Sequence, residues 1–362
     1  MAFALEMYPV LYFARYNAGT KNWEEQWVTQ DSVSYDELQK LAGGERERLL
    51  SARNKLPLPA VSYTSQYGYG CFEGMKAFPQ KNGGVSIFRP DRNGARFENS
   101  LKGLRCPVFP HKMYVQACAE FIRRNAALGY VPRYESEWEK NDFATAKAVY
   151  VRPFMTSEGA IGVSCAKEPY VIICATTVSN YFTSGGTKAV TTKRIRATPN
   201  GTGYIKCGSN YVISALAKKE AEEQGFMEAV FLDSEHHKYL QEGSSCNIFL
   251  LLKNGTLVTP ELQDTILPGI TRSSIIDLAR RQGIKTEERL VSIDEAMNDA
   301  AECFVSGTAA GITPIESITH NGTEAVFNNR SPGKTSLMLL KQLKGIQYGT
   351  CEDTNNWNYK VL

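Results

Sequence analysis

The sequence EGSSCNIFLLLKNGTLVTPELQDTILPGITR occupies residues 242–272 and decides the fold. It contains two apolar runs of β-branched and aliphatic residues, Cys246–Leu252 and Thr256–Thr259. Asn254-Gly255 lies between them, and this dipeptide is the strongest short hairpin signal that a sequence offers. We therefore expect two adjacent antiparallel strands in this stretch.

Both helices and strands are expected on either side of the hairpin. Leu267-Pro-Gly-Ile-Thr-Arg272 leads directly into an apolar pattern at helical spacing. Strands and helices do not alternate regularly along the chain, which favours an α+β fold over a doubly wound sheet. The expected helices are Ser34–Ala52, Arg89–Leu104, Lys112–Leu128, Tyr211–Gln224 and Thr271–Gln282, and the expected strands are Val85–Phe88, Ala148–Phe154, Tyr170–Val178, Ala189–Ala197, Glu228–Asp233, Tyr239–Glu242, Cys246–Leu252, Thr256–Thr259 and Ala301–Ser306.

The chain is long enough for two domains, because 362 residues exceed the size of one typical domain. Asn180–Lys188 is the best linker candidate, since it lies mid-chain and contains Gly185-Gly186. We expect a smaller N-terminal domain over residues 1–179, a linker over 180–188 and a larger domain over 189–362.

Composition excludes several classes of function. The 41 basic and 38 acidic residues give a net charge of +3 without a long basic run, so neither nucleic acid nor a membrane surface is an expected partner. The N-terminal 19 residues have no basic head and are interrupted by Glu6, Pro9 and Arg15, so we expect no signal peptide.

Nine scattered cysteines without a C-x-x-C pair indicate reduced thiols and a cytoplasmic protein. Four histidines without metal-ligand spacing disfavour a metal enzyme.

Two stretches resemble phosphate-binding motifs but lack essential residues. Gly201-Thr-Gly203-Tyr-Ile-Lys206 has lysine where a dinucleotide fingerprint requires its third glycine. Ser331-Pro-Gly-Lys-Thr335 ends like a P-loop, but the required earlier glycine would fall at Asn328. We interpret the second stretch as a surface turn that opens the C-terminal helix.

Lys206 is the candidate residue for covalent chemistry. A lysine forms an imine with an aldehyde most readily where its surroundings lower the ammonium pKa and shield the nitrogen. Lys206 lies in GYIKCGSNY, between apolar or aromatic neighbours and glycines. Most lysines are solvated surface groups, so the hypothesis depends on the residues that accompany this one.

Those residues match the needs of pyridoxal 5′-phosphate. Glu242, among small neighbours at a strand end, could face the pyridine nitrogen, and Tyr211 could donate to the ring oxygen. Leu267–Arg272 leads into a helix whose free amides attract a phosphate, and Gly307–Gly311 offers a second amide-rich turn. Arg96 could supply a cation. For each feature alone, core packing, a solvent-facing side chain or a structural turn is a common alternative.

Several motifs together resemble a known family. Glu242-x-x-x-x-Asn247-Ile-Phe, Leu257-Val-Thr and Leu267-Pro-Gly-Ile-Thr-Arg272 look like the signature of fold-type IV pyridoxal-phosphate enzymes. Within that class the chain resembles the branched-chain amino acid aminotransferases from about Trp23 to Gly349. The motifs that carry this closer resemblance are Phe72–Phe78 (FEGMKAF), Phe88–Phe97 (FRPDRNGARF), Tyr150–Pro153 (YVRP), Lys206–Tyr211 (KCGSNY) and Ser306–Ile315 (SGTAAGITPI).

The resemblance implies a fold, an activity and residue roles. It implies a two-domain homodimer that moves the α-amino group of L-leucine, L-isoleucine or L-valine to 2-oxoglutarate, giving glutamate by a ping-pong mechanism. Lys206 would bind the cofactor as a Schiff base, in the larger, cofactor-binding domain. Further cofactor contacts would be Arg96, Tyr211, Glu242, Ile270, Thr271 and Thr308; substrate contacts would be Tyr67, Phe72, Tyr150, Tyr181, Ser245 and Ala309, with Arg152 receiving the distal carboxylate of glutamate or 2-oxoglutarate.

The chain departs from some members of this family. Ala310-Gly-Ile-Thr313 replaces a redox C-x-x-C, which excludes thiol switching there, and Ser245 stands where many members carry threonine. A D-amino-acid aminotransferase or an aminodeoxychorismate lyase would keep Lys206 and Glu242, so both remain alternatives. A non-catalytic protein on this fold would be expected to have lost Lys206, Glu242 or Arg96.

Overall fold

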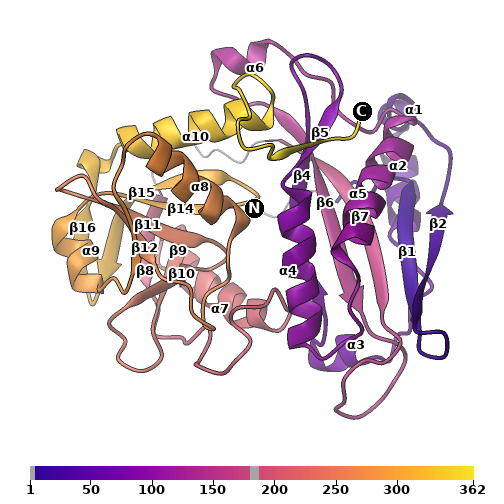
Figure 1. The fold of residues 1–362 in the computed structure, drawn as a ribbon, viewed down its shortest axis with the longest axis horizontal. Coiled ribbons are helices and arrows are strands. Elements are labelled where there is room, and N and C mark those ends of the chain that lie inside the picture. The colour runs from indigo at the N-terminus through magenta and orange to yellow at the C-terminus, as the bar shows by residue number, and fades with distance from the viewer. Residues whose placement is uncertain (1–4, 180–186) are drawn as a thin grey trace. The chain divides into compact units, whose positions relative to one another are not determined.

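The structure, a computed structural model, describes residues 5–179 and 187–362. It forms two compact units, drawn as ribbons in Figure 1. The first unit comprises Met1–Asn180, Lys206–Ser209 and Ile346–Leu362, and the second comprises Tyr181–Ile205 and Asn210–Gly345. Helices and strands are mixed without regular alternation, which confirms the α+β prediction.

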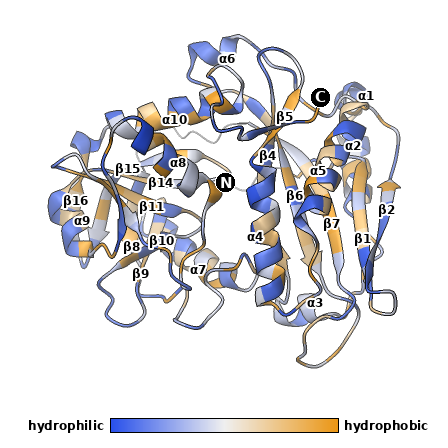
Figure 2. Ribbon diagram, viewed as in Figure 1, coloured by the Kyte–Doolittle hydropathy of each residue, from blue (hydrophilic) through white to orange (hydrophobic). Residues whose placement is uncertain are grey.

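The first unit is built on an antiparallel sheet in the order β17-β5-β4-β6-β7-β1-β2, with β3 paired to β6. Apolar residues concentrate on β1, β6 and β7 in Figure 2, whereas α2 is largely hydrophilic. The strands are β1 (Val10–Asn17), β2 (Asn22–Thr29), β3 (Cys71–Phe72), β4 (Met75–Pro79), β5 (Val85–Phe88), β6 (Lys147–Thr156), β7 (Tyr170–Ser179) and β17 (Asn358–Lys360).

Two long helices complete the core of the first unit. They pack against each other, and α5 also contacts β1. Phe97 and Leu101 of α4 and Phe121 and Ile122 of α5 are fully buried. The helices are α1 (Tyr35–Lys40), α2 (Gly43–Arg53), α3 (Tyr63–Tyr67), α4 (Pro90–Gly103), α5 (His111–Ala126) and α6 (Glu137–Lys140).

The second unit contains a sheet in the order β10-β9-β8-β15-β14-β11-β12-β13, with β16 paired to β15. Because β10 also pairs with β11, six of these strands close into a ring. The strands are β8 (Thr187–Thr191), β9 (Glu228–Leu232), β10 (Leu240–Gly243), β11 (Asn247–Leu252), β12 (Leu257–Pro260), β13 (Thr286–Arg289), β14 (Ala300–Gly307), β15 (Gly311–His320) and β16 (Thr323–Val326); the helices are α7 (Asn210–Glu223), α8 (Ile270–Arg281), α9 (Ile293–Asp299), the 3₁₀ helix Asn328–Arg330 and α10 (Lys334–Gln347).

The structure corrects three sequence expectations. The helix expected over Ser34–Ala52 is two helices, because Leu41 and Ala42 adopt extended backbone between them. The strand expected over Ala189–Ala197 ends at Thr191. Thr187 and Lys188 lie in β8 rather than in a linker, and residues 180–186 lie outside the described part of the chain.

The division into units also differs from the boundary expected at residue 189. Lys206–Ser209 and Ile346–Leu362 belong to the first unit. The C-terminal segment does so because β17 pairs with β5, placing Asn358 opposite Phe88. Such pairing between distant segments has no local sequence signal.

Candidate active site

Lys206 is held in the first unit by main-chain pairing. The amide of Phe72 donates to the carbonyl of Lys206 over 3.1 Å, and the amide of Gly208 donates to the carbonyl of Gly70 over 2.8 Å. The amide of Lys206 itself donates to the Ser100 hydroxyl of α4 over 3.1 Å. These bonds fix the lysine backbone between β3 and α4.

The Lys206 amine lies in surroundings that disfavour its charge. Its Nζ is 4.9 Å from the centroid of the Phe72 ring. Desolvation lowers the pKa of Lys206 to about 8, the positive charge of Arg96 acts in the same direction, and Glu73 and Tyr150 act in the opposite direction. A neutral, nucleophilic amine is therefore accessible near physiological pH, as an imine-forming lysine requires.

Arg96 has a buried partner that the sequence did not point out. Its Nε donates to Glu73 Oε1 over 2.7 Å and its Nη2 donates to Glu73 Oε2 over 2.8 Å. Glu73 has no exposed side-chain surface. The Glu73 amide donates to the carbonyl of Pro153 over 2.7 Å, which fixes the backbone beside β6. The paired bonds orient the guanidinium plane, as fork-to-fork geometry does.

Tyr150 and Arg152 lie two residues apart on β6 and share one face of the sheet. Arg152 Nη2 donates to the Tyr150 hydroxyl over 3.0 Å, and its guanidinium carbon is 4.7 Å from the Phe72 ring centroid. The buried Nε of Arg152 has no hydrogen-bond partner among the described residues. A Cβ at Gly74 would collide with the Tyr150 hydroxyl, so only glycine admits this arrangement.

Of the two other tyrosines predicted to line the pocket, one lies in the described part of the chain and one does not. Tyr67 ends α3, is 44% exposed, and accepts a hydrogen bond from the amide of Gly162 over 3.2 Å. Tyr181 lies outside the described residues.

In the second unit, three donors surround the carboxylate of Glu242 at the end of β10. Asn247 Nδ2 donates to Oε1 over 2.8 Å, and the amide of Leu267 donates to the same oxygen over 3.2 Å. Arg196 Nη1 lies 2.9 Å from Oε2, and both side chains are almost completely buried. Arg196 and Asn247 are functional candidates that residue spacing did not reveal.

Strand register brings the predicted turns to one edge of the second sheet. Glu242 pairs with Asn247, and Asn247 pairs with Ser306 on β14. Ser245 lies in the turn between β10 and β11, and Thr308 and Ala309 lie in the turn between β14 and β15. A Cβ on Gly307 would lie 3.7 Å from the Ser245 carbonyl, so the two turns are neighbours.

The N-terminus of α8 joins this edge. Gly269 is its N-cap, and Ile270 and Thr271 are its first two residues, whose amides have no acceptor within a helix. Asn247 Nδ2 donates to the carbonyl of Leu267 over 3.0 Å, and a Cβ at Gly269 would overlap the Asn247 amide. This positive helix end can hold an anion such as a phosphate.

Tyr211 is the second residue of α7 in the second unit, and it is partly buried. The helix start is fixed by Asn210, whose Nδ2 donates to the carbonyls of Thr202 and Ile205 over 2.7 and 3.1 Å. The stretch Gly201–Ile205 is therefore a turn braced against α7 and not a dinucleotide loop.

The P-loop-like stretch also has a structural explanation. The amides of Thr335 and Ser336 at the start of α10 donate to the carboxylate of Glu302 over 2.9 and 3.0 Å. The chain's own carboxylate thus occupies the anion position at this helix end, and the interpretation as a structural turn is confirmed.

The predicted residues fall into two groups by unit. The first unit brings together Lys206, Arg96, Phe72, Tyr150 and Arg152; the second brings together Glu242, Ser245, Ile270, Thr271, Thr308 and Ala309.

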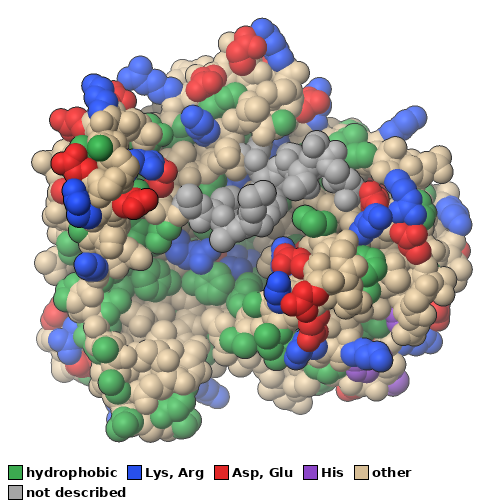
Figure 3. All heavy atoms as spheres, turned by 180° about the vertical axis from the view of Figure 1, so that it is seen from behind, with side chains coloured by type: hydrophobic (Ala, Val, Ile, Leu, Met, Phe, Trp, Pro, Cys, Tyr) green, Lys and Arg blue, Asp and Glu red, His purple; other side chains and the backbone are tan. Residues whose placement is uncertain are grey.

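Other properties of the described residues bear on the class of protein. Residues 5–179 and 187–362 contain no cluster of metal-ligating side chains and no helix long and apolar enough to cross a membrane. All nine cysteines are free thiols. Basic and acidic side chains are interspersed on the face drawn in Figure 3.

Comparisons with known proteins show the family of the chain. A model of the class IV aminotransferases matches residues 70–318. A branched-chain-amino-acid aminotransferase of Mycobacterium tuberculosis is 37% identical over 303 residues, covering 80% of this chain and 79% of that protein. Branched-chain amino acid aminotransferase 2, chloroplastic, of Humulus lupulus is 35% identical over 327 residues, covering 89% and 76%.

A solved structure extends the similarity to the fold. The branched-chain amino acid aminotransferase of Escherichia coli superposes with a TM-score of 0.69 at 29% identity, covering 85% of this chain and 95% of that one. Another branched-chain amino acid aminotransferase, solved with pyridoxamine 5′-phosphate, gives a TM-score of 0.73 at 28% identity, covering 85% and 94%. The chain belongs to the class IV aminotransferase family and, within it, to the branched-chain amino acid aminotransferases.

Proposed function

We propose that the protein transfers the α-amino group of L-leucine, L-isoleucine and L-valine to 2-oxoglutarate, with pyridoxal 5′-phosphate as its cofactor. The observation that carries the proposal is Lys206, an amine whose pKa is lowered to about 8 in a chain of this family. The products are the branched-chain 2-oxo acids and L-glutamate.

The residues present fit this cofactor. Arg96 of the first unit would supply a cation for its phosphate, and in the second unit the amides of Ile270 and Thr271 at a helix start and Thr308 in the adjacent turn would donate to it. Its pyridine nitrogen requires a carboxylate, which Glu242 would supply, and Tyr211 would donate to its ring oxygen. When bound, pyridoxal phosphate supplies an aldehyde that captures amino groups and a ring that withdraws electrons from the substrate Cα.

Lys206 has two tasks in this proposal. Its neutral amine would hold the cofactor through its aldehyde, and the lowered pKa of Lys206 favours this role. The same amine would also serve as the base that takes the proton from Cα of a bound amino acid and later gives it back. Both tasks require a base that changes protonation state near the working pH.

The proposed contacts involve both ends of the substrate, its α-carboxylate and its side chain. Ser245 and Ala309 would offer groups to the α-carboxylate, and Tyr67, Phe72 and Tyr150 would line the pocket for the substrate side chain. Arg152 receives the distal carboxylate of 2-oxoglutarate or glutamate. The unpartnered buried Nε of Arg152 supports this role, because a buried donor without an acceptor is costly until a ligand supplies one.

A stacked guanidinium suits both kinds of substrate. The guanidinium carbon of Arg152 lies 4.7 Å from the ring centroid of Phe72 and 5.2 Å from that of Tyr150. The flat face of such a group can lie along an aliphatic chain, and its edge can bind a carboxylate. One pocket can therefore accept leucine and glutamate in turn.

A substrate panel tests the proposal. The purified protein is assayed with L-leucine, L-isoleucine, L-valine, D-alanine and aminodeoxychorismate, each at equal concentration with 2-oxoglutarate where an acceptor is needed. We expect turnover of the three branched L-amino acids. Preferred turnover of D-alanine, or pyruvate release from aminodeoxychorismate, would assign the protein to one of the two alternative activities instead.

We also propose that the protein acts as a cytoplasmic homodimer. Nine free thiols suit a reducing compartment. In the first unit, Ile161 is 82% exposed and Val163 is 90% exposed, and Val61 and Tyr67 are also exposed. Exposed apolar side chains that gather on one surface are typical of a contact with another protein chain.

A further inference from the structure

Arg196 forms an ion pair that the reaction scheme above does not use. It lies in the segment that follows β8, and its Nη1 is 2.9 Å from Glu242 Oε2. The side chains are 7% and 5% exposed, so water screens this pair very little.

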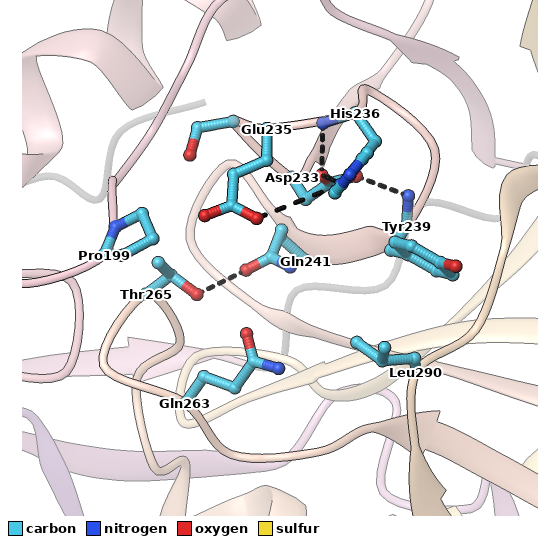
Figure 4. A pocket seen from close by; sticks show the side chains of 10 residues that line it. Pro199, Asp233, Glu235, His236, Tyr239, Gln241, Gln263, Thr265 and Leu290 are labelled. Carbon is cyan, nitrogen blue, oxygen red and sulfur yellow. Dashed lines mark hydrogen bonds and ion pairs between the residues drawn. The ribbon is translucent and has the colours of Figure 1, made fainter.

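The guanidinium of Arg196 is fixed from a second direction. Its Nη1 also donates to the carbonyl of Thr265 over 3.0 Å. The Thr265 hydroxyl donates to Gln241 Oε1 over 2.6 Å, a bond drawn in Figure 4 on the wall of a pocket of about 180 Å³. Because Gln241 directly precedes Glu242 on β10, these two hydrogen bonds link the guanidinium of Arg196 to the strand that carries Glu242.

Three other ionisable groups near Glu242 differ from Arg196 in charge or in their partners. Arg272 lies within electrostatic range of Glu242, but its Nη2 contacts the Pro260 carbonyl and Glu288 over 2.8 and 2.9 Å. Glu228 is negative and accepts the amide of Ser244 over 2.8 Å. Cys246 is a partly buried thiol whose pKa is raised by desolvation, and it carries no charge at neutral pH. Arg196 thus forms a short and almost completely buried ion pair with Glu242.

We propose that Arg196 is a positioning residue that keeps Glu242 ionised and oriented, so that the proton it shares with the pyridine nitrogen of the cofactor stays on the nitrogen. This inference rests on the proposed function, because it assigns a role toward the same cofactor. It concerns one proton, which lies either on the ring nitrogen facing a carboxylate or on Glu242 facing a neutral ring. No other atom moves between these two states, and the positive charge of Arg196 favours the first.

The consequence for the reaction is direct. A protonated ring withdraws electrons from the substrate Cα more strongly than a neutral ring, so loss of the Arg196 charge lowers kcat. Substrate contacts lie elsewhere, so KM changes little. A residue that served stability alone would not move the proton.

The test uses holoenzyme reconstituted with cofactor labelled with ¹⁵N at the pyridine nitrogen, observed by NMR between pH 6 and pH 9. Arg196→Gln removes the charge, and citrulline at position 196 removes the charge while keeping the shape and the N–H donors. Arg196→Lys keeps a charge. Arg194→Gln is the matched control, because Arg194 is exposed and pairs with Glu220.

We expect the wild type, Arg196→Lys and Arg194→Gln to show the resonance of a protonated nitrogen. In Arg196→Gln and the citrulline variant, the resonance moves toward that of the unprotonated ring, and kcat falls by about ten-fold or more, as a pKa change of one unit or more implies. We expect the KM for leucine to stay within about two-fold. Because citrulline preserves packing, a folding defect of Arg196→Gln does not remove the test.

Two failures are distinguishable. A citrulline variant with a fully protonated nitrogen and wild-type kcat would overturn the role of Arg196 while leaving the proposed function intact. Absence of a bound cofactor resonance in the wild type would overturn the proposed function itself.

Discussion

The carboxylate of Glu73 holds the guanidinium of Arg96 through two parallel hydrogen bonds, of 2.7 Å to Nε and 2.8 Å to Nη2. Glu73 precedes β4, and Arg96 lies on α4, so the pair links the sheet of the first unit to a helix that covers it. A buried cation requires such a partner, because an unpaired buried charge is strongly destabilising.

Replacement of Glu73 should therefore destabilise the chain. Glu73→Gln leaves Arg96 buried without a counter-charge, and we expect a loss of about 3 kcal/mol in the free energy of unfolding, measured by urea denaturation. Glu98→Gln is the control, since Glu98 lies on α4 like Arg96, is partly exposed, and makes a long ion pair of 3.8 Å with Lys102. Equal stability of Glu73→Gln and wild type would show that the pair is not needed.

The lowered pKa of Lys206 predicts how cofactor attachment depends on pH. Only the neutral amine attacks an aldehyde, so below about pH 8 the reacting fraction falls, and as pH rises through about 8 it grows. The rate at which apoenzyme takes up pyridoxal phosphate, followed by visible absorbance, should rise through this range and then level off.

The same measurement has an internal check. Arg152 lowers the Lys206 pKa together with Arg96, while Glu73 and Tyr150 raise it. Arg152→Gln should move the midpoint to higher pH, whereas Arg15→Gln, at an exposed position of β1, should not. A rate that is flat from pH 6.5 to 9.5 would contradict the assigned titration.

Replacement of Arg152 should affect the kinetics of 2-oxoglutarate much more than those of leucine. Hydrogen bonds to charged groups contribute about 1.5–3 kcal/mol, so Arg152→Met should raise the KM for 2-oxoglutarate by roughly 10- to 100-fold. We expect kcat/KM for leucine to change much less, because an aliphatic side chain has no charge to pair. Steady-state kinetics with each substrate measure both values, with Arg15→Met as the control; equal losses for both substrates would remove Arg152 from the distal-carboxylate role.

The exposed apolar residues near Tyr67 should lie in the dimer contact. Ile161→Asp combined with Val163→Asp puts charges on a surface that we expect to be buried in the homodimer, so the 40.2 kDa chain should sediment as a monomer. Thr20→Asp, in the exposed turn between β1 and β2, should leave the dimer intact. A double variant that remains dimeric would place the contact elsewhere.

Local signals predicted local structure well. The strand Val85–Phe88 and the hairpin at Asn254-Gly255 are confirmed, since Gly255 adopts a φ of 85° that favours glycine. Helices α4, α5, α7 and α8 each begin and end within two residues of their expected positions. These elements depend on periodicity and turn residues, which a sequence shows directly.

Long-range pairing was not predictable in this way. The segment Val10–Thr29 forms β1 and β2, although β2 is polar and largely exposed and has no strand pattern. Lys206 joins the first unit through bonds that Phe72 and its neighbours make, although these residues lie far earlier in the chain. Glu73 and Arg196 were missed for the same reason, because a charged residue's buried partner is apparent only once distant segments meet.

The central claim is that Lys206 binds the cofactor covalently, and its most direct test is chemical trapping. Holoenzyme is reduced with borohydride and digested, and the peptide that carries the phosphopyridoxyl group is identified by mass spectrometry. Lys76 is the informative competitor, because burial lowers its pKa to about 8 as well. We predict the label on Lys206 and its complete loss in Lys206→Ala; a label on Lys76, or wild-type turnover by Lys206→Ala, would contradict the account.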